Sequence, residues 1–356
     1  MKLFSPNSYL ILGLIGVLSS ALYANPIKIG MSAPLTGPSS HLGISLLEGI
    51  RPSIININKN GGIQGRLVEL IVLDDQYNPK KTIQNTITLI KEKKVDLLFS
   101  YVGTPTTLQA SPLLIKYNKP LFFPFTGAHV LHHGNIGNMI YHWRPNYWEE
   151  STAIVNHFIK NNQKNIAIYY QKDAFGQSGL LGIKNALSRH KKSPVSITSY
   201  PRGKSFSDDF SDEATRLLEK KPDAIICISS YEASAGLIKA IRQKNTVPIA
   251  TISFSDPIGV SEKLNNQPAL MTNIIYSQVV PDKTQILDLD NYKKITKKPF
   301  NPIRYEGYKN TIKLIEILSK HSLKEIRLAH KSIQQQLNEE HTVTLLKSTK
   351  NGWTPL

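Results

Sequence analysis

The fold is first indicated by the stretch Pro26-Ile27-Lys28-Ile29-Gly30-Met31-Ser32-Ala33-Pro34-Leu35-Thr36-Gly37, which is typical of a strand followed at once by a turn. Outward from it, apolar runs of strand length alternate with helical patterns along the chain. Many of the runs are apolar on both faces, as expected of parallel strands buried between two layers of helices. The alternation therefore predicts an α/β fold with parallel sheets.

The expected elements follow from this alternation. We expect strands at 27–32, 68–73, 95–100, 121–125, 165–170, 195–200, 224–228, 249–253 and 273–278. We expect helices at 44–59, 80–93, 105–116, 149–161, 176–190, 208–218, 232–244, 288–297, 305–319 and 323–337. The alternation breaks near Arg144 and again near Val279, and the two α/β blocks look alike in plan. That similarity predicts a pair of lobes.

The first residues, 1–24, have the order of a secretory signal: the charged Lys2, an apolar run at 9–18 and the small Ala24. A run of about ten apolar residues is shorter than the roughly 20 that a membrane-spanning helix needs. We therefore expect this signal peptide to be removed and the protein to work in the periplasm. No cysteine stands at the expected cleavage site, so we expect no lipid anchor.

Composition narrows the classes of function. The chain of 356 residues is long enough for two domains, and its single cysteine, Cys227, lies in an apolar run and predicts no internal disulfide. The net charge is +17, but the lysines are scattered and no basic stripe is interleaved with aromatic residues. We therefore expect no nucleic acid partner, while attraction to anionic envelope surfaces stays open.

The signatures of common enzymes do not occur in the sequence. It contains no Gly-x-Gly-x-x-Gly after a strand, no phosphate-binding Gly-x-x-x-x-Gly-Lys-Ser/Thr, no Gly-x-Ser-x-Gly elbow and no His-Glu-x-x-His helix. We therefore expect no catalytic residues, no cofactor and no metal.

Small and polar residues instead follow several expected strands. Thr104 stands before Pro105, where it can cap the next helix. The N-terminus of that helix would then offer free N–H groups, and Thr104 a hydroxyl, to a carboxylate. Ser229 and Glu232 fit a capping box that leaves Tyr231 free to project. Further clusters lie at 125–127 and 171–176. Because ligands bind outside the carboxyl ends of parallel strands, these clusters predict a binding site.

At these residues the chain resembles the periplasmic branched-chain amino acid binding proteins, the type-I receptors of leucine/isoleucine/valine ABC transporters. The resemblance rests on motifs in a fixed order: Pro34-Leu35-Thr36-Gly37, Asn58-Lys59-Asn60-Gly61-Gly62-Ile63-Gln64-Gly65-Arg66, Asp74-Asp75-Gln76-Tyr77-Asn78-Pro79, Gln171-Lys172-Asp173-Ala174-Phe175-Gly176, Ser277-Gln278-Val279-Val280-Pro281 and Tyr305-Glu306-Gly307-Tyr308. It implies two Rossmann-like lobes with parallel sheets, joined by a three-crossover hinge. The first lobe would comprise 25–144 and 279–340, and the second 145–278 and 341–356.

The resemblance also implies a ligand site between the lobes. Segments matching 103–104 and 125–127 hold the ligand's carboxylate and ammonium in such relatives, and other matching positions line the side-chain pocket. The implied ligand-binding residues are Leu42, Tyr101, Gly103, Thr104, Phe125, Thr126, Gly127, Phe175, Tyr231 and Ser253.

Two departures from the family pattern leave the ligand open. The acidic partner of the ammonium, expected near Ser253, is missing or displaced to Asp256. A disulfide of some members would need cysteines at about Tyr77 and Gly103, and both are absent.

The function implied is that of an extracytoplasmic solute receptor. We expect a monomer that binds an amino acid, or a related small carboxylate or amide, and delivers it to a membrane ABC permease. The alternative is a ligand-sensing module for a chemoreceptor or sensor kinase. A third possibility, an enzyme with a cleft of the same shape, lacks a nucleophile–base pair or a metal set in the sequence.

Overall fold

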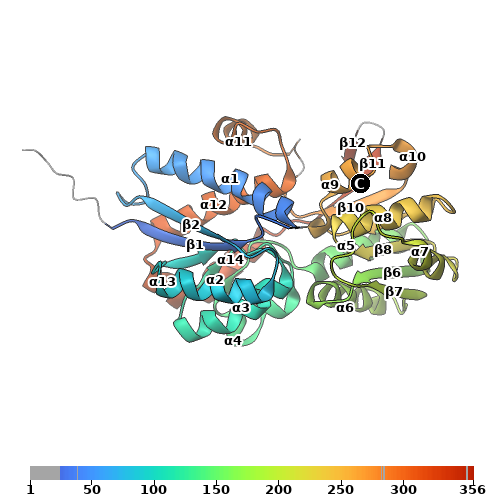
Figure 1. The fold of residues 1–356 in the computed structure, drawn as a ribbon, viewed down its shortest axis with the longest axis horizontal. Helices are drawn as coiled ribbons and strands as arrows, with labels where there is room; N and C mark the ends of the chain where they lie inside the picture. Colours follow the sequence, from blue (N-terminus) through green and yellow to red (C-terminus); the bar gives the residue numbers. More distant parts are fainter. Residues whose placement is uncertain (1–24, 38, 282, 284, 350–351) are drawn as a thin grey trace, which may run out of the picture.

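The computed structural model describes residues 25–37, 39–281, 283, 285–349 and 352–356, so the predicted signal peptide lies outside the described residues. Two α/β bodies lie side by side, each built around one sheet (Figure 1). The first sheet is parallel, with the order β2-β1-β3-β4-β5. Its strands are β1 (Ile27–Ala33), β2 (Val68–Asp74), β3 (Leu97–Phe99), β4 (Leu121–Phe122) and β5 (Ile140–Tyr141).

Helices cover both faces of the first sheet. On one face, α1 (Ser40–Lys59) packs against α12 (Pro302–Lys320), and on the other α2 (Pro79–Lys91) packs against α3 (Thr104–Tyr117) (Figure 1). Gly307 allows α12 to approach α1 closely, because a Cβ atom there would lie 2.3 Å from the backbone oxygen of Leu46. The lobe also contains α4 (Gly134–Gly137), α11 (Leu289–Thr296), α13 (Leu323–Leu328) and α14 (His330–Glu339).

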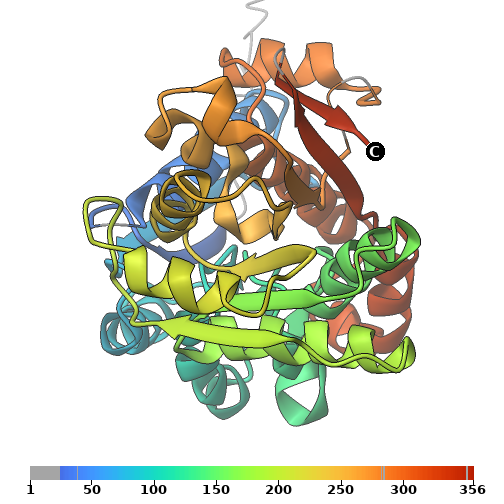
Figure 2. The same ribbon diagram turned by 90° about the vertical axis from the view of Figure 1, so that its right-hand side faces the viewer.

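The second sheet has the order β12-β11-β10-β9-β8-β6-β7. The parallel strands are β6 (Ile166–Gln171), β7 (Ser196–Tyr200), β8 (Ala224–Ile228), β9 (Ile249–Thr251) and β10 (Ile274–Gln278). At the edge, β11 (Thr344–Thr349) and β12 (Gly352–Pro355) run antiparallel, drawn in red in Figure 2. The helices are α5 (Tyr147–Lys160), α6 (Ala174–Arg189), α7 (Ser211–Leu218), α8 (Tyr231–Arg242), α9 (Pro257–Lys263) and α10 (Pro268–Met271).

The predicted α/β fold with two Rossmann-like lobes is confirmed. Within the described part of the chain, three segments pass from one sheet to the other: between β5 and α5, between β10 and α11, and between α14 and β11. The exact lobe boundaries given above stay a prediction.

A buried charge network lies where the crossovers meet. Arg144, between β5 and α5, donates to Glu306 Oε2 of α12 at 2.5 Å and to the hydroxyl of Ser253. Glu150 of α5 accepts from the backbone N–H of Ser253 at 2.7 Å and from Ser277 Oγ at 2.5 Å. Burial raises the pKa of both glutamates, against the opposing effect of the Arg144 charge. The network thus ties a helix of the first lobe to strand ends of the second.

Several elements differ from the sequence prediction. The expected single helix at 323–337 is wrong, since it is divided into α13 and α14 at Ala329. The edge strands β11 and β12 were not predicted, because their pairing with β10 is a long-range contact. Pro52 lies inside α1, which runs unbroken through it although proline lacks the N–H for a helical hydrogen bond.

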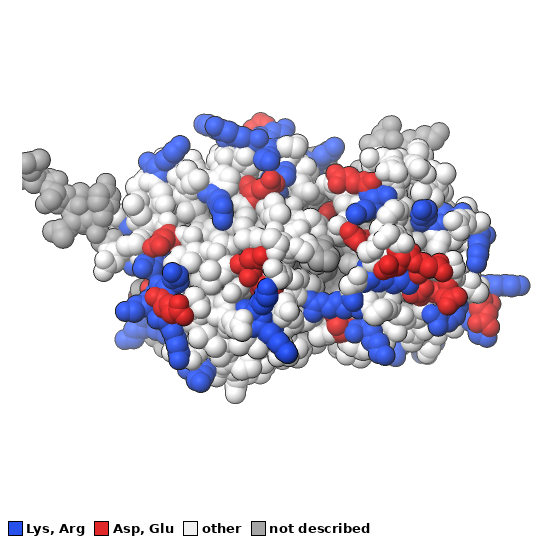
Figure 3. All heavy atoms as spheres, in the orientation of Figure 1, with Lys and Arg blue, Asp and Glu red and all other residues white. Residues whose placement is uncertain are grey.

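The interior is continuous across the two lobes. One apolar cluster includes Met31 of β1, Phe125 after β4 and Phe175 of α6, while Cys227 of β8 is buried in a second cluster. On the face in Figure 3, Lys and Arg side chains are spread over both lobes with acidic residues between them. Among the described residues, no helix has the length and apolar character to cross a membrane.

Candidate ligand-binding cleft

Two predicted site residues meet at the carboxyl edge of the first sheet. A parallel bridge pairs Val102 with Phe125, and the N–H of Gly103 donates to the carbonyl of Phe125 at 3.1 Å. This pairing places Thr104 Oγ1 2.7 Å from Thr126 Oγ1, and both residues are fully buried. The prediction that Thr104 caps α3 is wrong. Gly103, with φ +93°, is the capping residue, and Thr104 is the first residue of the helix.

The ring of Tyr77 covers this edge. A Cβ atom added to Gly103 would lie 2.2 Å from Tyr77 Cε2, so the ring rests directly on the glycine. Tyr77 is 8% exposed, and its hydroxyl has no hydrogen-bond partner among the described residues. These are the two positions where the resemblance places a disulfide in some members. In this chain an aromatic ring rests on a glycine at about the two positions for which the resemblance implied a covalent link in some members.

Aromatic rings from both lobes close the space beside Tyr77. The ring centroid of Phe254 lies 4.7 Å from Phe175, 5.6 Å from Phe125 and 6.4 Å from Tyr77. Phe125 also carries the Arg144 guanidinium 4.4 Å from its centroid. The predicted residues Phe125 and Phe175 therefore belong to a packed aromatic cluster between the lobes.

Three other predicted residues pack against or form hydrogen bonds with neighbouring residues of the protein. The hydroxyl of Tyr101 lies 3.0 Å from Thr86 Oγ1, and burial raises its pKa. Gly127 has no room for a side chain, because a Cβ atom would lie 2.8 Å from the Tyr147 ring. Ser253 Oγ donates to Glu150 Oε1 at 2.9 Å within the charge network.

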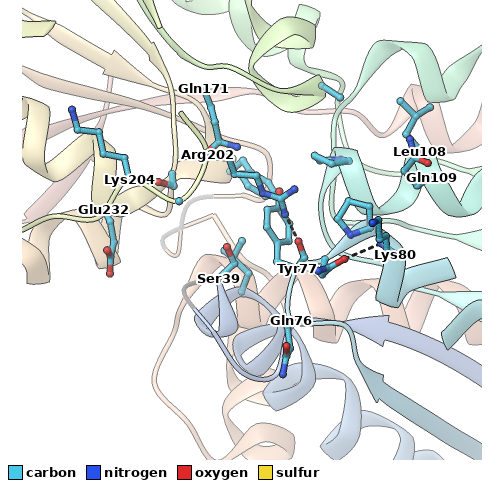
Figure 4. Close-up of a pocket in the computed structure, with 18 of the residues that line it drawn as sticks. Ser39, Gln76, Tyr77, Lys80, Leu108, Gln109, Gln171, Arg202, Lys204 and Glu232 are labelled. Atoms are coloured by element: carbon cyan, nitrogen blue, oxygen red, sulfur yellow. Dashed lines mark hydrogen bonds between the residues drawn. The ribbon is translucent and has the colours of Figure 1, made fainter. Parts of the chain in front are cut away.

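A cavity of about 810 Å³ opens between the lobes on the outer side of Tyr77 (Figure 4). Of the predicted residues, Leu42 and Tyr231 line it, whereas Tyr101, Gly103, Thr104, Phe125, Thr126, Gly127, Phe175 and Ser253 do not. Its lining comes from both lobes and includes Ser39, His41, Leu42, Gln76, Tyr77, Lys80, Ile83, Pro105, Leu108, Gln109, Gln171, Arg202, Lys204, Ser230, Tyr231, Glu232 and Phe254.

Arg202 contacts the first lobe across the cleft. It follows β7 in the second lobe, and its guanidinium lies 4.4 Å from the ring centroid of Tyr77 in the first lobe. The same guanidinium donates to the backbone oxygen of Tyr77 (Figure 4). A cation stacked on an aromatic face contributes roughly 0.5–2 kcal/mol, so this pair favours the closed arrangement of the lobes.

Tyr231 lies on the second lobe and faces the first. Its ring centroid is 4.1 Å from that of His41, and its hydroxyl donates to Glu232 Oε1 at 2.9 Å. Burial opposes ionisation of Glu232, but hydrogen bonds from Lys263 and Tyr231 lower its pKa overall. The predicted capping box at Ser229 is wrong, because the α8 cap is the next residue along the chain, and Ser229 Oγ instead lies 2.6 Å from the hydroxyl of Ser234.

Asp256 caps α9 and stands close to the cavity without lining it. It accepts from the N–H of Ile258 at 3.2 Å, and its Oδ2 lies 3.9 Å from His41 Nε2. Burial raises the pKa of Asp256 to about 6. Among the described residues, no group of three His, Cys, Asp or Glu side chains is arranged to hold a metal ion.

The sequence prediction missed Tyr77 and Arg202, although a usable signal was present. Both follow the carboxyl ends of parallel strands, Tyr77 after β2 and Arg202 after β7. The rule that ligands bind at these ends applies to every strand of a parallel sheet. Extending it to these two strands would have added both residues to the candidate list.

Two α/β lobes joined by three crossovers, with a cavity between them, define the architecture of a two-lobed protein with a cleft. The model of the periplasmic binding protein family matches residues 26–299, and the chain belongs to this family. The resemblance drawn from the sequence motifs is thereby confirmed.

Similar proteins fit this assignment. Leu/Ile/Val-binding protein homolog 3 of Brucella melitensis biotype 1 is 25% identical over 62% of this chain and 58% of its own length. Leu/Ile/Val-binding protein BraC3 of Rhizobium johnstonii is 25% identical over 66% of this chain and 63% of its own length. The chain thus spans less than two thirds of these relatives.

A solved structure supports the fold over nearly the whole chain. The crystal structure of a possible leucine/isoleucine/valine-binding protein from Rhodopirellula baltica SH 1 matches with a TM-score of 0.84 at 24% identity. The match covers 95% of this chain and 98% of that one. At this level of identity it is the fold that the likeness shows.

Proposed function

We propose that this chain is a periplasmic solute receptor that binds an amino acid, or a related small carboxylate or amide, between its lobes and delivers it to a membrane ABC permease. Membership of the periplasmic binding protein family supports this proposal, as do the names of the two leucine/isoleucine/valine-binding relatives. In this function no bond of the ligand is made or broken, so the chain is not an enzyme.

The observation that carries the proposal is the cavity lined by both lobes. Leu42 and Tyr77 line it from the first lobe, and Arg202 and Tyr231 line it from the second. A ligand shifts the balance between open and closed forms only through contacts that differ between them. A solute touching all four residues favours the closed form, which is the form that a permease can distinguish from the empty receptor.

Binding is tested first by thermal unfolding with a panel of amino acids, their amides and their deaminated acids. A true ligand at about 100 times its dissociation constant adds about 2.7 kcal/mol to the free energy of unfolding. Small-angle X-ray scattering with the same ligand should show a smaller radius of gyration. Tyr231→Ala should weaken binding, whereas Lys184→Ala should not, because Lys184 is an exposed residue of α6 that does not line the cavity. Chemical conversion of the bound compound, or no stabilisation by any member, would contradict the proposal.

A further inference from the structure

Tyr77 is held as a fixed floor of the cavity. Asp75, which is fully buried, accepts from Ser32 Oγ at 2.9 Å, from Thr82 Oγ1 at 3.1 Å and from the N–H of Tyr77 at 2.9 Å. The loop is therefore anchored immediately before the ring that rests on Gly103. Thr104 and Thr126 are fully buried and do not line the cavity, whereas Tyr77 does, so a ligand there meets the ring and not the two hydroxyls.

The two cations on either side of this floor are available to a ligand. Within the part of the chain that the structure describes, neither Arg202 nor Lys80 forms an ion pair with a carboxylate. A guanidinium has five N–H donors, and the Nη2 group of Arg202 donates to the backbone of Tyr77. Lys204 differs from these two cations, because its ammonium is paired with Glu213.

The acids near the cavity are already engaged. Glu232 lines the cavity, but it accepts Lys263 Nζ at 3.0 Å and the hydroxyl of Tyr231. Asp173 accepts from Gln171 Nε2 at 2.6 Å and caps α6. Asp256 caps α9 and does not line the cavity. A ligand ammonium would therefore lie near two cations without a free carboxylate to pair it, which is unfavourable.

Apolar side chains of both lobes make up much of the remaining wall, namely Leu42, Ile83, Leu108, Tyr231 and Phe254. Polar side chains also line it, among them Ser39, His41, Gln76, Gln109 and Gln171. The volume of about 810 Å³ lies within the range of roughly 300–1,000 Å³ found for sites that enclose drug-sized ligands. The cavity is thus suited to a ligand with an apolar body and one anionic end.

We propose that the cleft selects an organic acid with an apolar body and no ammonium group, that Arg202 binds the carboxylate, and that Tyr77 keeps it from the Thr104–Thr126 hydroxyls. The inference rests on the proposed function, since it names the ligand class of the same cleft. Arg202 and Tyr77 are specificity-determining residues in this proposal, because each belongs to one lobe and they meet only across the cleft.

Matched probes separate the contributions of the two charges. We would titrate the whole receptor, freed of its signal peptide, with 3-phenylpropanoate, L-phenylalanine and 3-phenylpropanamide by calorimetry. The same would be done with 4-methylpentanoate, L-leucine and 4-methylpentanamide. Each set shares one body and differs in the ammonium and the carboxylate. The expected result is that at least one acid binds at least tenfold more tightly than its amino acid and its amide.

Two variants assign this preference to residues. Arg202→Ala should weaken binding of the acid at least tenfold and remove its advantage over the amide, while Arg189→Ala, an exposed arginine on the same lobe, should leave both unchanged. Tyr77→Phe keeps the floor and should keep the preference. Tyr77→Ala should expose the Thr104 and Thr126 hydroxyls to the cavity. It should therefore reduce the preference in affinity for the acid over the amino acid.

Other outcomes overturn the inference. Binding of either amino acid as tightly as its matched acid would do so and leave the proposed function intact. Binding of neither acid would also do so, and the proposed function would then be judged by the wider panel and by closure in scattering. An acid preference that survives Arg202→Ala would remove the role of Arg202.

Discussion

Gly103 shows how one small residue shapes the cleft. Its φ of +93° lies where residues other than glycine are strained, and the Tyr77 ring leaves no room for a side chain. The positive φ and the lack of space for a side chain together allow the ring of Tyr77 to rest on the start of α3.

Gly103→Ala should therefore destabilise the protein by about 2–4 kcal/mol, from backbone strain and from the clash with Tyr77. Gly61 has the same φ but nothing within 4 Å of the position of its Cβ, so Gly61→Ala should cost only about 1–2 kcal/mol. Urea unfolding measures both. In a Tyr77→Ala background, the loss caused by Gly103→Ala should shrink. An equal loss in both backgrounds would contradict the contact.

At this scale the sequence assigned Thr104 and Thr126 to one predicted site, but it did not indicate which side chain covers them. Thr104 and Thr126 follow neighbouring parallel strands, so their proximity follows from the sheet. The place of the Tyr77 ring depends on two consecutive left-handed residues, Gln76 at φ +53° and Tyr77 at φ +56°. Such a turn is set by the buried anchor Asp75, which no local pattern indicates.

Among the elements, α12 presents two glutamates in opposite surroundings. Glu306 is buried and pairs with Arg144 at 2.5 Å, whereas Glu316 is partly exposed and pairs with Lys320 at 2.7 Å. Removing one partner of a buried pair leaves an uncompensated charge, while a surface pair is weak. The Arg144–Glu306 pair therefore stabilises the crossover before α5, whereas the Glu316–Lys320 pair contributes little to stability.

Glu306→Gln should lower the free energy of unfolding by about 3 kcal/mol, and Glu316→Gln by no more than about 0.5 kcal/mol. Both changes neutralise one acid on the same helix, so the comparison separates burial from charge. Chemical denaturation at neutral pH measures the difference. Equal effects of the two changes would show that the buried pair does not stabilise the hinge.

The elements themselves were predicted wherever local pattern and burial agree. The strand expected at 224–228 is β8 without any shift, because its residues are all apolar and all buried. The helix expected at 323–337 fails because a break at Ala329 lets α14 lie against β5, where His330 Nε2 is 3.1 Å from the Ile140 oxygen. That contact joins distant parts of the chain.

At the scale of the whole molecule, burial makes the stability depend on pH, and buried histidine and aspartate side chains contribute with opposite signs. Burial lowers the pKa of His142 to about 3, whereas burial raises the pKa of Asp75 and of Asp256 to about 6. An unfolded histidine binds a proton near pH 6.5, so the contribution of His142 is complete above that pH and is lost as the pH falls toward 3. The two aspartates act in the opposite direction, gaining stability as the pH falls below 6.

His142→Gln should therefore flatten the fall in stability between pH 6.5 and 5 by about 2 kcal/mol, at 1.36 kcal/mol per unit of pKa. The glutamine can still donate to the Leu131 oxygen, which His142 Nε2 meets at 3.0 Å. Unfolding free energies of both proteins across this range measure the change. Parallel pH profiles would contradict a neutral, buried His142.

Cys227, the single cysteine of the sequence, has a consequence for measuring closure. It is fully buried in β8, and burial raises the pKa of its thiol, so it stays protonated and out of reach of alkylating reagents in the folded state. Cysteines introduced in pairs on the two surfaces could thus be tagged with dyes without first removing the natural one. Energy transfer between such dyes would report the distance between the lobes of single molecules in real time.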